Sequence, residues 1–113
     1  MYNKIIIQHN LNPTHKSEIP NSTHVRECVD SMCGDDVTLY LKINNGIIED
    51  AGYTGYGCAV SQAYADILID EIIGKDIESA KNLNFAERYQ ETTRKKCAML
   101  GWNTLKEILE DAQ

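Results

Sequence analysis

The sequence predicts an α+β fold, in which a small three-stranded antiparallel sheet is packed by helices on one face. Three observations support this prediction. Apolar and polar residues alternate over 37–43, as they do along a half-buried strand. Asn44-Asn45-Gly46 follows, and Asn-Gly favours the tight turns of β-hairpins. From residue 59 onwards, apolar residues recur every three or four positions, which is typical of helices that lie on a sheet.

The strands are expected in the middle of the chain. Residues 37–43 form the first strand, and residues 47–54 return antiparallel to it. Residues 52–57 are expected to add a third, short strand that its glycines weaken. Residues 2–9 suit a short helix, whereas residues 10–32 contain two prolines and many polar residues with little periodicity. The interval 10–32 is therefore predicted to be a loop or a semi-ordered, mobile N-terminal arm.

Helices are expected to fill the rest of the chain. Residues 59–73 place apolar side chains on one helical face, and Gly74 is suited to end that helix. Residues 76–83 predict a short helical connector, and residues 85–95 predict a further helix. The last helix is expected to begin near residue 97.

Composition restricts the class of protein. The 113 residues are enough for one domain, 1–113, but not for two. A net charge of −6 at pH 7 argues against nucleic acid or an anionic membrane as the main partner. The apolar run at 5–7 is too short for a signal peptide or a membrane span. We therefore expect a cytoplasmic protein, in which disulfides are uncommon, and the composition leaves its oligomeric state open.

The four cysteines are candidates for metal ligation or sulfur chemistry, with inert buried thiols as the alternative. Three of them fall at predicted junctions: Cys33 before the first strand, Cys58 between sheet and helix, and Cys97 at the start of the last helix. Their spacing contains no CxxC motif, so it is weak support for zinc on its own. Cys28 lies in the predicted arm, where a buried hydrophobic role and a role as a spare thiol are both open.

A carboxylate accompanies the first of these cysteines. Gly34 allows a sharp turn that would bring Asp35 near the Cys33 thiolate, and Asp36 competes for this role from the next position. Three soft thiolates and one hard carboxylate suit tetrahedral Zn²⁺. The same set suits an iron–sulfur cluster with one weak ligand.

Basic residues directly precede the last cysteine. Because a nearby cation lowers the pKa of a thiol, Lys96 and Arg94 are candidates for stabilising a thiolate or persulfide at Cys97. A solvated helix end is the alternative interpretation. Tyr56, which lies between two glycines, is expected to pack against the thiols and shield them.

Five motifs together resemble the iron–sulfur cluster scaffold family, which includes IscU, SufU and the N-terminal part of NifU. They are Asn12-Pro13, Cys33-Gly34-Asp35, GIIEDA at 46–51, GYGCAVS at 55–61 and KCAMLGW at 96–102. The resemblance covers residues 12–109. It implies a scaffold that accepts sulfur from a cysteine desulfurase and assembles a transient [2Fe-2S] cluster for transfer to apoproteins. Such a scaffold is a sulfur acceptor rather than an enzyme.

The resemblance also implies a ligand set, namely Cys33, Asp35, Cys58 and Cys97. These residues would hold zinc in the resting form or a labile [2Fe-2S] cluster, which Asp35 would keep transferable. Cys97 or Cys33 would accept the persulfide sulfur. Two alternatives stay open: a zinc-dependent sulfur relay of the SufU type, and a structural zinc module without sulfur chemistry.

The chain departs from each branch of this family. IscU proteins have a histidine directly before the third cysteine, whereas this chain has Lys96, which resembles SufU. SufU proteins carry an insertion between the second and third cysteines, for which the interval 58–97 has no room. Residues 91–95 replace the Leu-Pro-Pro-Val-Lys segment that a dedicated Hsp70 chaperone grips in IscU proteins. The sequence therefore combines features of both branches.

Overall fold

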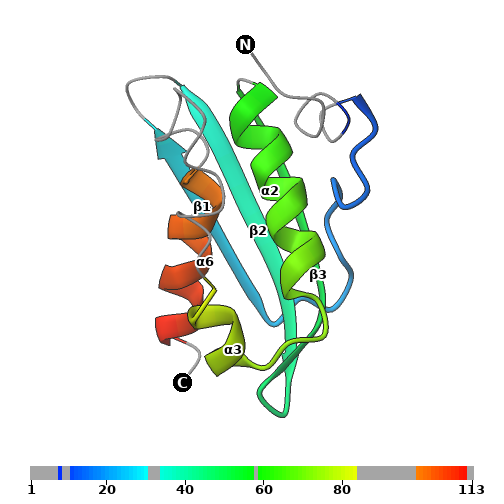
Figure 1. Cartoon of the computed structure of the whole chain (residues 1–113), viewed down its shortest axis with the longest axis vertical. Coiled ribbons are helices and arrows are strands. Elements are labelled where there is room, and N and C mark those ends of the chain that lie inside the picture. Colours follow the sequence, from blue (N-terminus) through cyan, green and yellow to red (C-terminus); the bar gives the residue numbers. More distant parts are fainter. Residues whose placement is uncertain (1–7, 9–10, 31–33, 58, 84–98, 112–113) are drawn as a thin grey trace.

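The computed structural model of the chain describes residues 8, 11–30, 34–57, 59–83 and 99–111. Its strands are β1 (His24–Asp30), β2 (Asp35–Asn44) and β3 (Ile47–Tyr56), and its helices are α2 (Ala59–Ile72), α3 (Ile77–Lys81) and α6 (Leu100–Asp111). The strands form one antiparallel sheet in the order β1-β2-β3, and the helices lie on one of its faces (Figure 1). The predicted α+β class is confirmed.

The hairpin between β2 and β3 is confirmed. Asn45 and Gly46 connect the two strands with φ angles of 53° and 75°. Positive φ at both positions is typical of the two-residue turn whose twist matches that of the strands, and glycine adopts it without strain. Along β2, Val37, Leu39 and Leu41 are fully buried while the residues between them are not. The alternation in the sequence therefore corresponds to the two faces of the sheet.

The third strand is not the one that the sequence predicts. Residues 52–57 do not form a separate short strand, because Gly52 and Gly55 lie within the continuous ladder of β3. The third strand is instead β1, inside the interval 10–32. The prediction of a loop or arm is therefore wrong for His24–Asp30.

Strand β1 gives little periodic signal because its charged residues lie on both faces. Val25 and Val29 are 56% and 54% exposed. Arg26 lies on the side of the helices, where its guanidinium is 3.4 Å from Glu107 Oε2 and 3.6 Å from Asp111 Oδ2 of α6. Pairing with the acidic side chains of α6 thus replaces the apolar burial that a half-buried strand normally shows.

Residues 14–17 lie along the free edge of β3 and against α2 (Figure 1). The backbone N–H of Tyr53 in β3 donates to His15 O over 3.1 Å. Thr14 Oγ1 and His15 N donate to the two carboxylate oxygens of Asp66, at 3.1 and 2.8 Å. This part of the predicted arm is therefore hydrogen-bonded to the sheet and to a helix.

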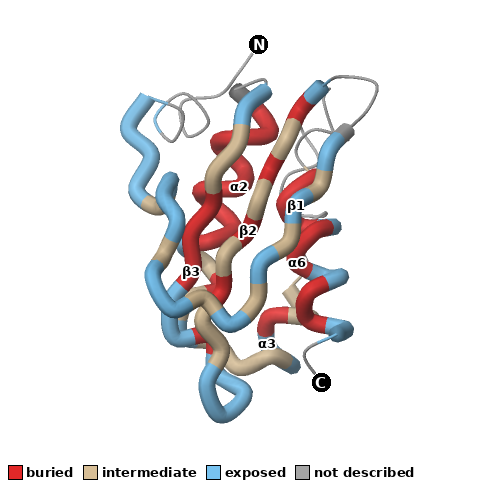
Figure 2. The backbone as a smooth tube through the Cα atoms, turned by 180° about the vertical axis from the view of Figure 1, so that it is seen from behind, coloured by how far each residue is buried: buried red, intermediate tan, exposed pale blue. Residues whose placement is uncertain are grey.

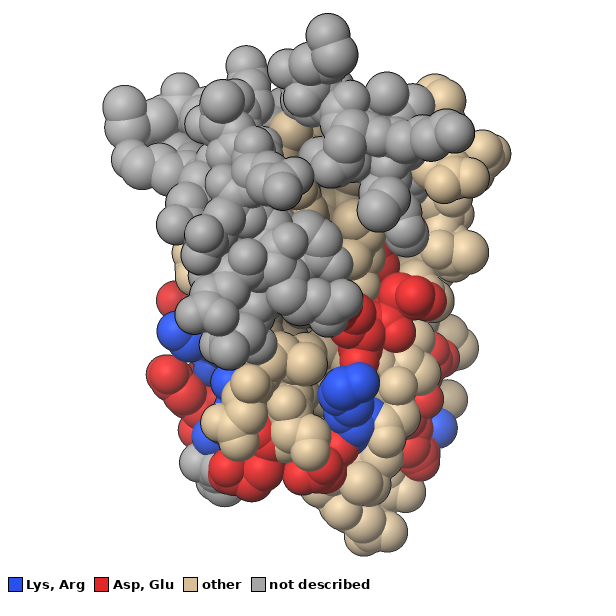
Figure 3. Space-filling view, in the orientation of Figure 1, with Lys and Arg blue, Asp and Glu red and all other residues tan. Residues whose placement is uncertain are grey.

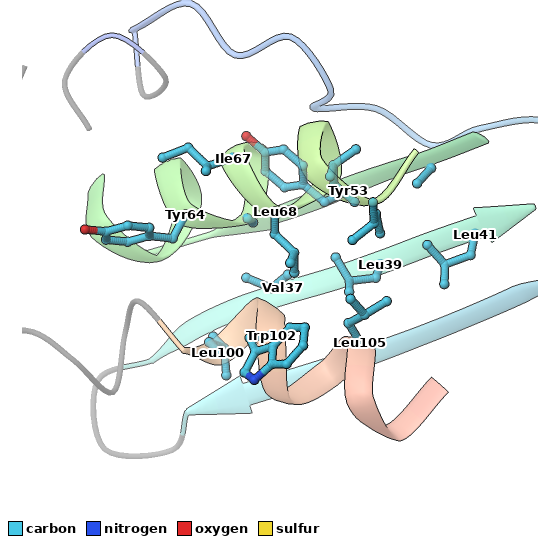
Figure 4. Close-up of a cluster of buried hydrophobic side chains, with 14 of the residues drawn as sticks. Val37, Leu39, Leu41, Tyr53, Tyr64, Ile67, Leu68, Leu100, Trp102 and Leu105 are labelled. Atoms are coloured by element: carbon cyan, nitrogen blue, oxygen red, sulfur yellow. The ribbon is translucent and has the colours of Figure 1, made fainter. Parts of the chain in front are cut away.

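The core lies between the sheet and helices α2 and α6, where the side chains of both layers point toward one another (Figure 4). Leu39 of β2, Leu68 of α2 and Leu105 of α6 are all completely buried. Gly101 of α6 faces Ala65 of α2, where a Cβ added to the glycine would make an ordinary van der Waals contact, 3.5 Å from Ala65 Cα. Helix α2 is buried along most of its length because the sheet, α6 and the arm surround it.

The predicted helices agree with the structure where the described residues cover them. Helix α2 confirms the helix predicted at 59–73, and Gly74 follows it with a φ of 89°. Helix α3 lies within the predicted connector at 76–83. The helices predicted at 2–9 and 85–95 fall outside the described residues, apart from Gln8. No helix in the described ranges combines the length and the apolarity that a bilayer span requires.

Candidate functional site

Several elements begin or finish at the end of the sheet opposite the hairpin. Asp35 begins β2 and Tyr56 finishes β3, and the strand register pairs Asp36 with Tyr56. Helix α2 begins here at Ala59 (Figure 1). We call this region, which Asp35, Tyr56 and Ala59 define, the Asp35 end.

The described neighbours of two predicted thiol ligands lie at the Asp35 end. Gly34 precedes Asp35 directly and is the sequence neighbour of Cys33, while Gly57 is the neighbour of Cys58. The following site residues lie outside the described part of the chain: Cys33, Cys58, Arg94, Lys96 and Cys97. Among the residues that are described, no three His, Cys, Asp or Glu side chains are grouped so that they could hold a metal ion.

Asp35 lies inside the protein, on the side of β2 that faces the helices, and is only 3% exposed. Its carboxylate packs directly against Gly57. A Cβ on Gly57 would overlap Oδ1 of Asp35 and lie 2.7 Å from its Cγ. Gly57 also has a φ of 137°, which side-chain-bearing residues rarely adopt. The structure thus places a buried carboxylate against the backbone that directly precedes Cys58.

Asp36 points to the other side of the sheet, because successive side chains of a strand alternate between its faces. We call that side the outer face; it carries Val25, Glu27, Val29, Asp36 and Tyr56. The two aspartates that compete in the sequence are therefore separated by the sheet itself. Asp35 alone of the pair lies on the side of the helices.

The predicted packing of Tyr56 is wrong. Its side chain is 77% exposed. Because Tyr56 pairs with Asp36 in the strand register, both side chains lie on the outer face.

Cys28 is part of β1 rather than of a loop. It pairs with Val37 on the side of the sheet that faces the helices, is half-buried and packs against the hydrophobic core. This environment favours the hydrophobic role among the two that the sequence leaves open.

Gln62 fixes the Asp35 end, a role that is not evident from its place in the sequence. Its side chain is 5% exposed, and Nε2 donates to the carbonyl oxygens of Tyr56 and Asp36 at 3.0 and 3.3 Å. The first turns of α2 are thereby joined to the ends of both β2 and β3. The one signal in the sequence that could have indicated this role is that Gln62 follows Cys58 by four residues in a stretch predicted to be helical.

Two acidic side chains lie close together on the outer face. A hydrogen bond with Asp36, and the repulsion of its charge, raise the pKa of Glu27 above its ordinary value of 4.5. The folded protein therefore disfavours the ionised form of Glu27 more than the unfolded chain does.

Replacing Glu27 with glutamine is expected to raise the melting temperature at pH 7. A carboxyl group with a raised pKa weakens the fold as the pH rises through the ordinary and then the raised pKa. The gain in melting temperature should therefore shrink as the pH is lowered and disappear below pH 4.5. Thermal unfolding of wild type and variant between pH 3 and pH 8 measures it. Glu110→Gln, at an exposed site on α6, is the control, and an equal pH-dependent gain there would contradict the role of the pair.

Residues 1–112 match the family model described as the NifU-like N terminal domain. The chain belongs to this family, which includes the IscU and SufU proteins. The iron-sulfur cluster assembly scaffold protein IscU of Thermotoga maritima is 31% identical, over 97% of this chain and 93% of that protein. The zinc-dependent sulfurtransferase SufU of Bacillus subtilis is 36% identical, over 74% of this chain and 56% of that protein.

The fold of this chain agrees with that of a solved structure. The crystal structure of a putative iron-sulfur cluster assembly scaffold protein for the SUF system, from Fervidobacterium islandicum AW-1, superposes with a TM-score of 0.84. The two chains are 30% identical, and the match covers 96% of each.

Proposed function

We propose that this chain is a scaffold on which an iron–sulfur cluster is assembled from iron and from the sulfur of a cysteine desulfurase. The cluster is then passed to apoproteins. The observation that carries the proposal is the buried carboxylate of Asp35 against Gly57, next to Cys58, in a member of the IscU and SufU family. The relatives named as IscU scaffolds support the same function.

The proposed ligands are Cys33, Asp35, Cys58 and Cys97. Thiolates are soft donors that suit iron and zinc, whereas a carboxylate oxygen is a harder and weaker donor for a cluster. Three strong ligands and one weak ligand fit a cluster that is cargo and must leave the protein. The same donor set also fits a tetrahedral zinc ion in the resting form.

Sulfur reaches the scaffold by persulfide exchange. The thiolate of Cys97 or Cys33 attacks the terminal sulfur of a persulfide on the desulfurase, the sulfur–sulfur bond breaks, and the desulfurase cysteine leaves as a thiolate. The terminal sulfur stays on this chain as a new persulfide. Lys96 and Arg94 stabilise the attacking thiolate at Cys97. This exchange belongs in the cytoplasm, where thiols are kept reduced.

The second candidate is a zinc-dependent sulfur relay that receives sulfur and passes it on without building a cluster. Two observations favour it. The relative from Bacillus subtilis is named a zinc-dependent sulfurtransferase, and Lys96 stands where the IscU branch has a histidine.

Anaerobic incubation with ferrous iron, cysteine and a cysteine desulfurase tests the two candidates. A scaffold develops visible charge-transfer absorption and binds iron and sulfide in near-equal amounts, and Cys58→Ser abolishes both. A relay keeps its zinc, shows no such absorption and accelerates desulfurase turnover. A protein that does neither is a structural zinc module, and both proposals are then wrong.

Replacing Asp35 with alanine is expected to slow the transfer of the cluster several-fold, because the weakest ligand no longer offers a route for exchange. The rate is measured from the visible absorption after an apo acceptor protein is added. Asp36→Ala is the matched control, since Asp36 is the next residue but points to the outer face. Equal release rates for Asp35→Ala and wild type would contradict the role of Asp35.

A further inference from the structure

The outer face of the sheet is uncovered by any described helix. Seen from behind, the strands lie in front of the helices; β1 alternates between exposed and half-buried residues, and β2 between half-buried and buried ones (Figure 2). Val25, Val29 and Tyr56 expose 56%, 54% and 77% of their surface there. Large apolar side chains gathered on one exposed face mark an interaction surface.

A hollow of about 480 Å³ lies in this face, between β1 and the arm. Glu27 and Asp36 contribute two carboxylates to its lining, whereas Lys16 contributes one amine. In the described part of the chain, none of these three groups forms an ion pair. Oδ1 of Asp36 is buried there without a hydrogen-bond partner. The hollow therefore carries negative charge that the described residues do not neutralise.

We propose that the outer face docks a segment of the cysteine desulfurase, which places an arginine or lysine side chain between Glu27 and Asp36. Apolar side chains of the same segment pack on Val25 and Val29. The cation relieves the repulsion between the two carboxylates, and the exposed ring of Tyr56 offers it a cation–π contact. This inference rests on the proposed function, which makes the desulfurase a partner.

Charge argues against a second copy of the chain as the occupant of the outer face. The net charge is −6, and two outer faces in contact would bring two pairs of carboxylates together. Acidic and basic side chains are interspersed over the lower part of the described helical face, which shows no large basic area that could complement the outer face (Figure 3).

The position of the outer face favours the desulfurase, which donates sulfur, over a cluster acceptor as the partner that binds there. Asp36 and Tyr56 are the sequence neighbours of Asp35 and Gly57, but their side chains point away from the buried carboxylate. A partner on the outer face is therefore held next to the Asp35 end without covering it. A desulfurase bound there can deliver its persulfide on a mobile loop, whereas an acceptor must approach the cluster itself.

The affinity of the 113-residue chain for a cysteine desulfurase tests the proposal. Calorimetric titration should show that Glu27→Arg weakens binding by about tenfold or more. Glu110→Arg, which changes the net charge equally from the helical face, should change binding by less than about twofold. Binding of wild type should weaken with added salt more steeply than binding of Glu27→Arg. Glu27→Gln serves as a second variant that removes the charge without adding bulk.

Three outcomes would overturn the docking proposal: equal desulfurase affinity for wild type and both Glu27 variants, equal losses for Glu27→Arg and Glu110→Arg, or a change in oligomeric state instead of affinity. Reconstitution of the wild-type protein with iron and inorganic sulfide tests the proposed function separately, because it needs no desulfurase. A cluster formed in this way, together with unchanged affinity of the Glu27 variants, contradicts the docking surface alone. Failure of this reconstitution contradicts the scaffold function.

Discussion

Replacing Gly57 with alanine is expected to destabilise the protein by about 3 kcal/mol and to abolish retention of zinc or a cluster. Two costs combine. A φ of 137° is strained for any residue with a Cβ, and the added Cβ would overlap Oδ1 of Asp35. To relieve the overlap, the Asp35 carboxylate or the backbone next to Cys58 must shift. Chemical denaturation measures the loss of stability, and metal analysis measures the loss of ligands.

A double-mutant cycle separates these two costs. In Asp35→Ala/Gly57→Ala the overlap with the carboxylate is gone and only the tight contact with the Cα of residue 35, at 3.0 Å, remains. The double variant should therefore be more stable than the sum of the single effects predicts. Gly74→Ala provides the control for strain alone, because Gly74 has a φ of 89° but a Cβ added there would meet no atom within 4 Å. We expect Gly74→Ala to lower the free energy of unfolding by about 1 kcal/mol. Similar costs at Gly57 and Gly74, with additivity in the cycle, would show that Gly57 does not accommodate Asp35.

Replacing Asp66 with alanine is expected to cost about 2 to 3 kcal/mol and to release the arm from α2. The carboxylate of Asp66 is completely buried and accepts hydrogen bonds from Thr14 Oγ1 and His15 N. Its removal leaves both donors without their charged acceptor, which is itself completely buried, in a partly buried site. Denaturation gives the stability, and hydrogen exchange at the backbone amide of Tyr53, which bonds to His15 O, should accelerate.

Asp70→Ala is the matched control for Asp66, one helical turn further along α2. Asp70 Oδ1 contacts the same residue of the arm, His15, at 3.2 Å from Nε2, but its side chain is 68% exposed. Exposed ion pairs contribute little to stability, so we expect a loss of unfolding free energy below about 0.5 kcal/mol and no change in hydrogen exchange at the backbone amide of Tyr53. Equal effects of the two substitutions would contradict the anchoring role of the buried carboxylate.

Much of the fold follows from signals that lie within a few residues of one another. Asn45 and Gly46 specify the hairpin because a primed turn needs positive φ at adjacent positions. The apolar periodicity of 59–73 specifies α2 because a helix must bury one face. The motifs around Cys33, Cys58 and Cys97 are likewise local, and they were sufficient to predict the family to which the chain belongs.

The features that the sequence misses depend on contacts between distant segments. Strand β1 is not evident because Arg26 lies on the side of the sheet that carries the helices, where Glu107 and Asp111 of α6 lie opposite it. Gln62 has no role until α2 is placed beside the carbonyl groups at the ends of β2 and β3. The exposure of a residue such as Tyr56 likewise depends on which face of the sheet the helices cover.

The α+β class, the hairpin, the main helix and the family can all be predicted from the amino-acid sequence, because turn chemistry, periodicity and motifs are properties of short stretches of chain. Which of Asp35 and Asp36 is buried, by contrast, depends on the tertiary structure. Adjacent aspartates are equivalent in composition, but the two-residue period of a strand sends them to opposite faces once the register is set. Pairing β2 with β3 sets that register, and the helices on one face then make Asp35 the buried carboxylate and Asp36 a residue of the outer face.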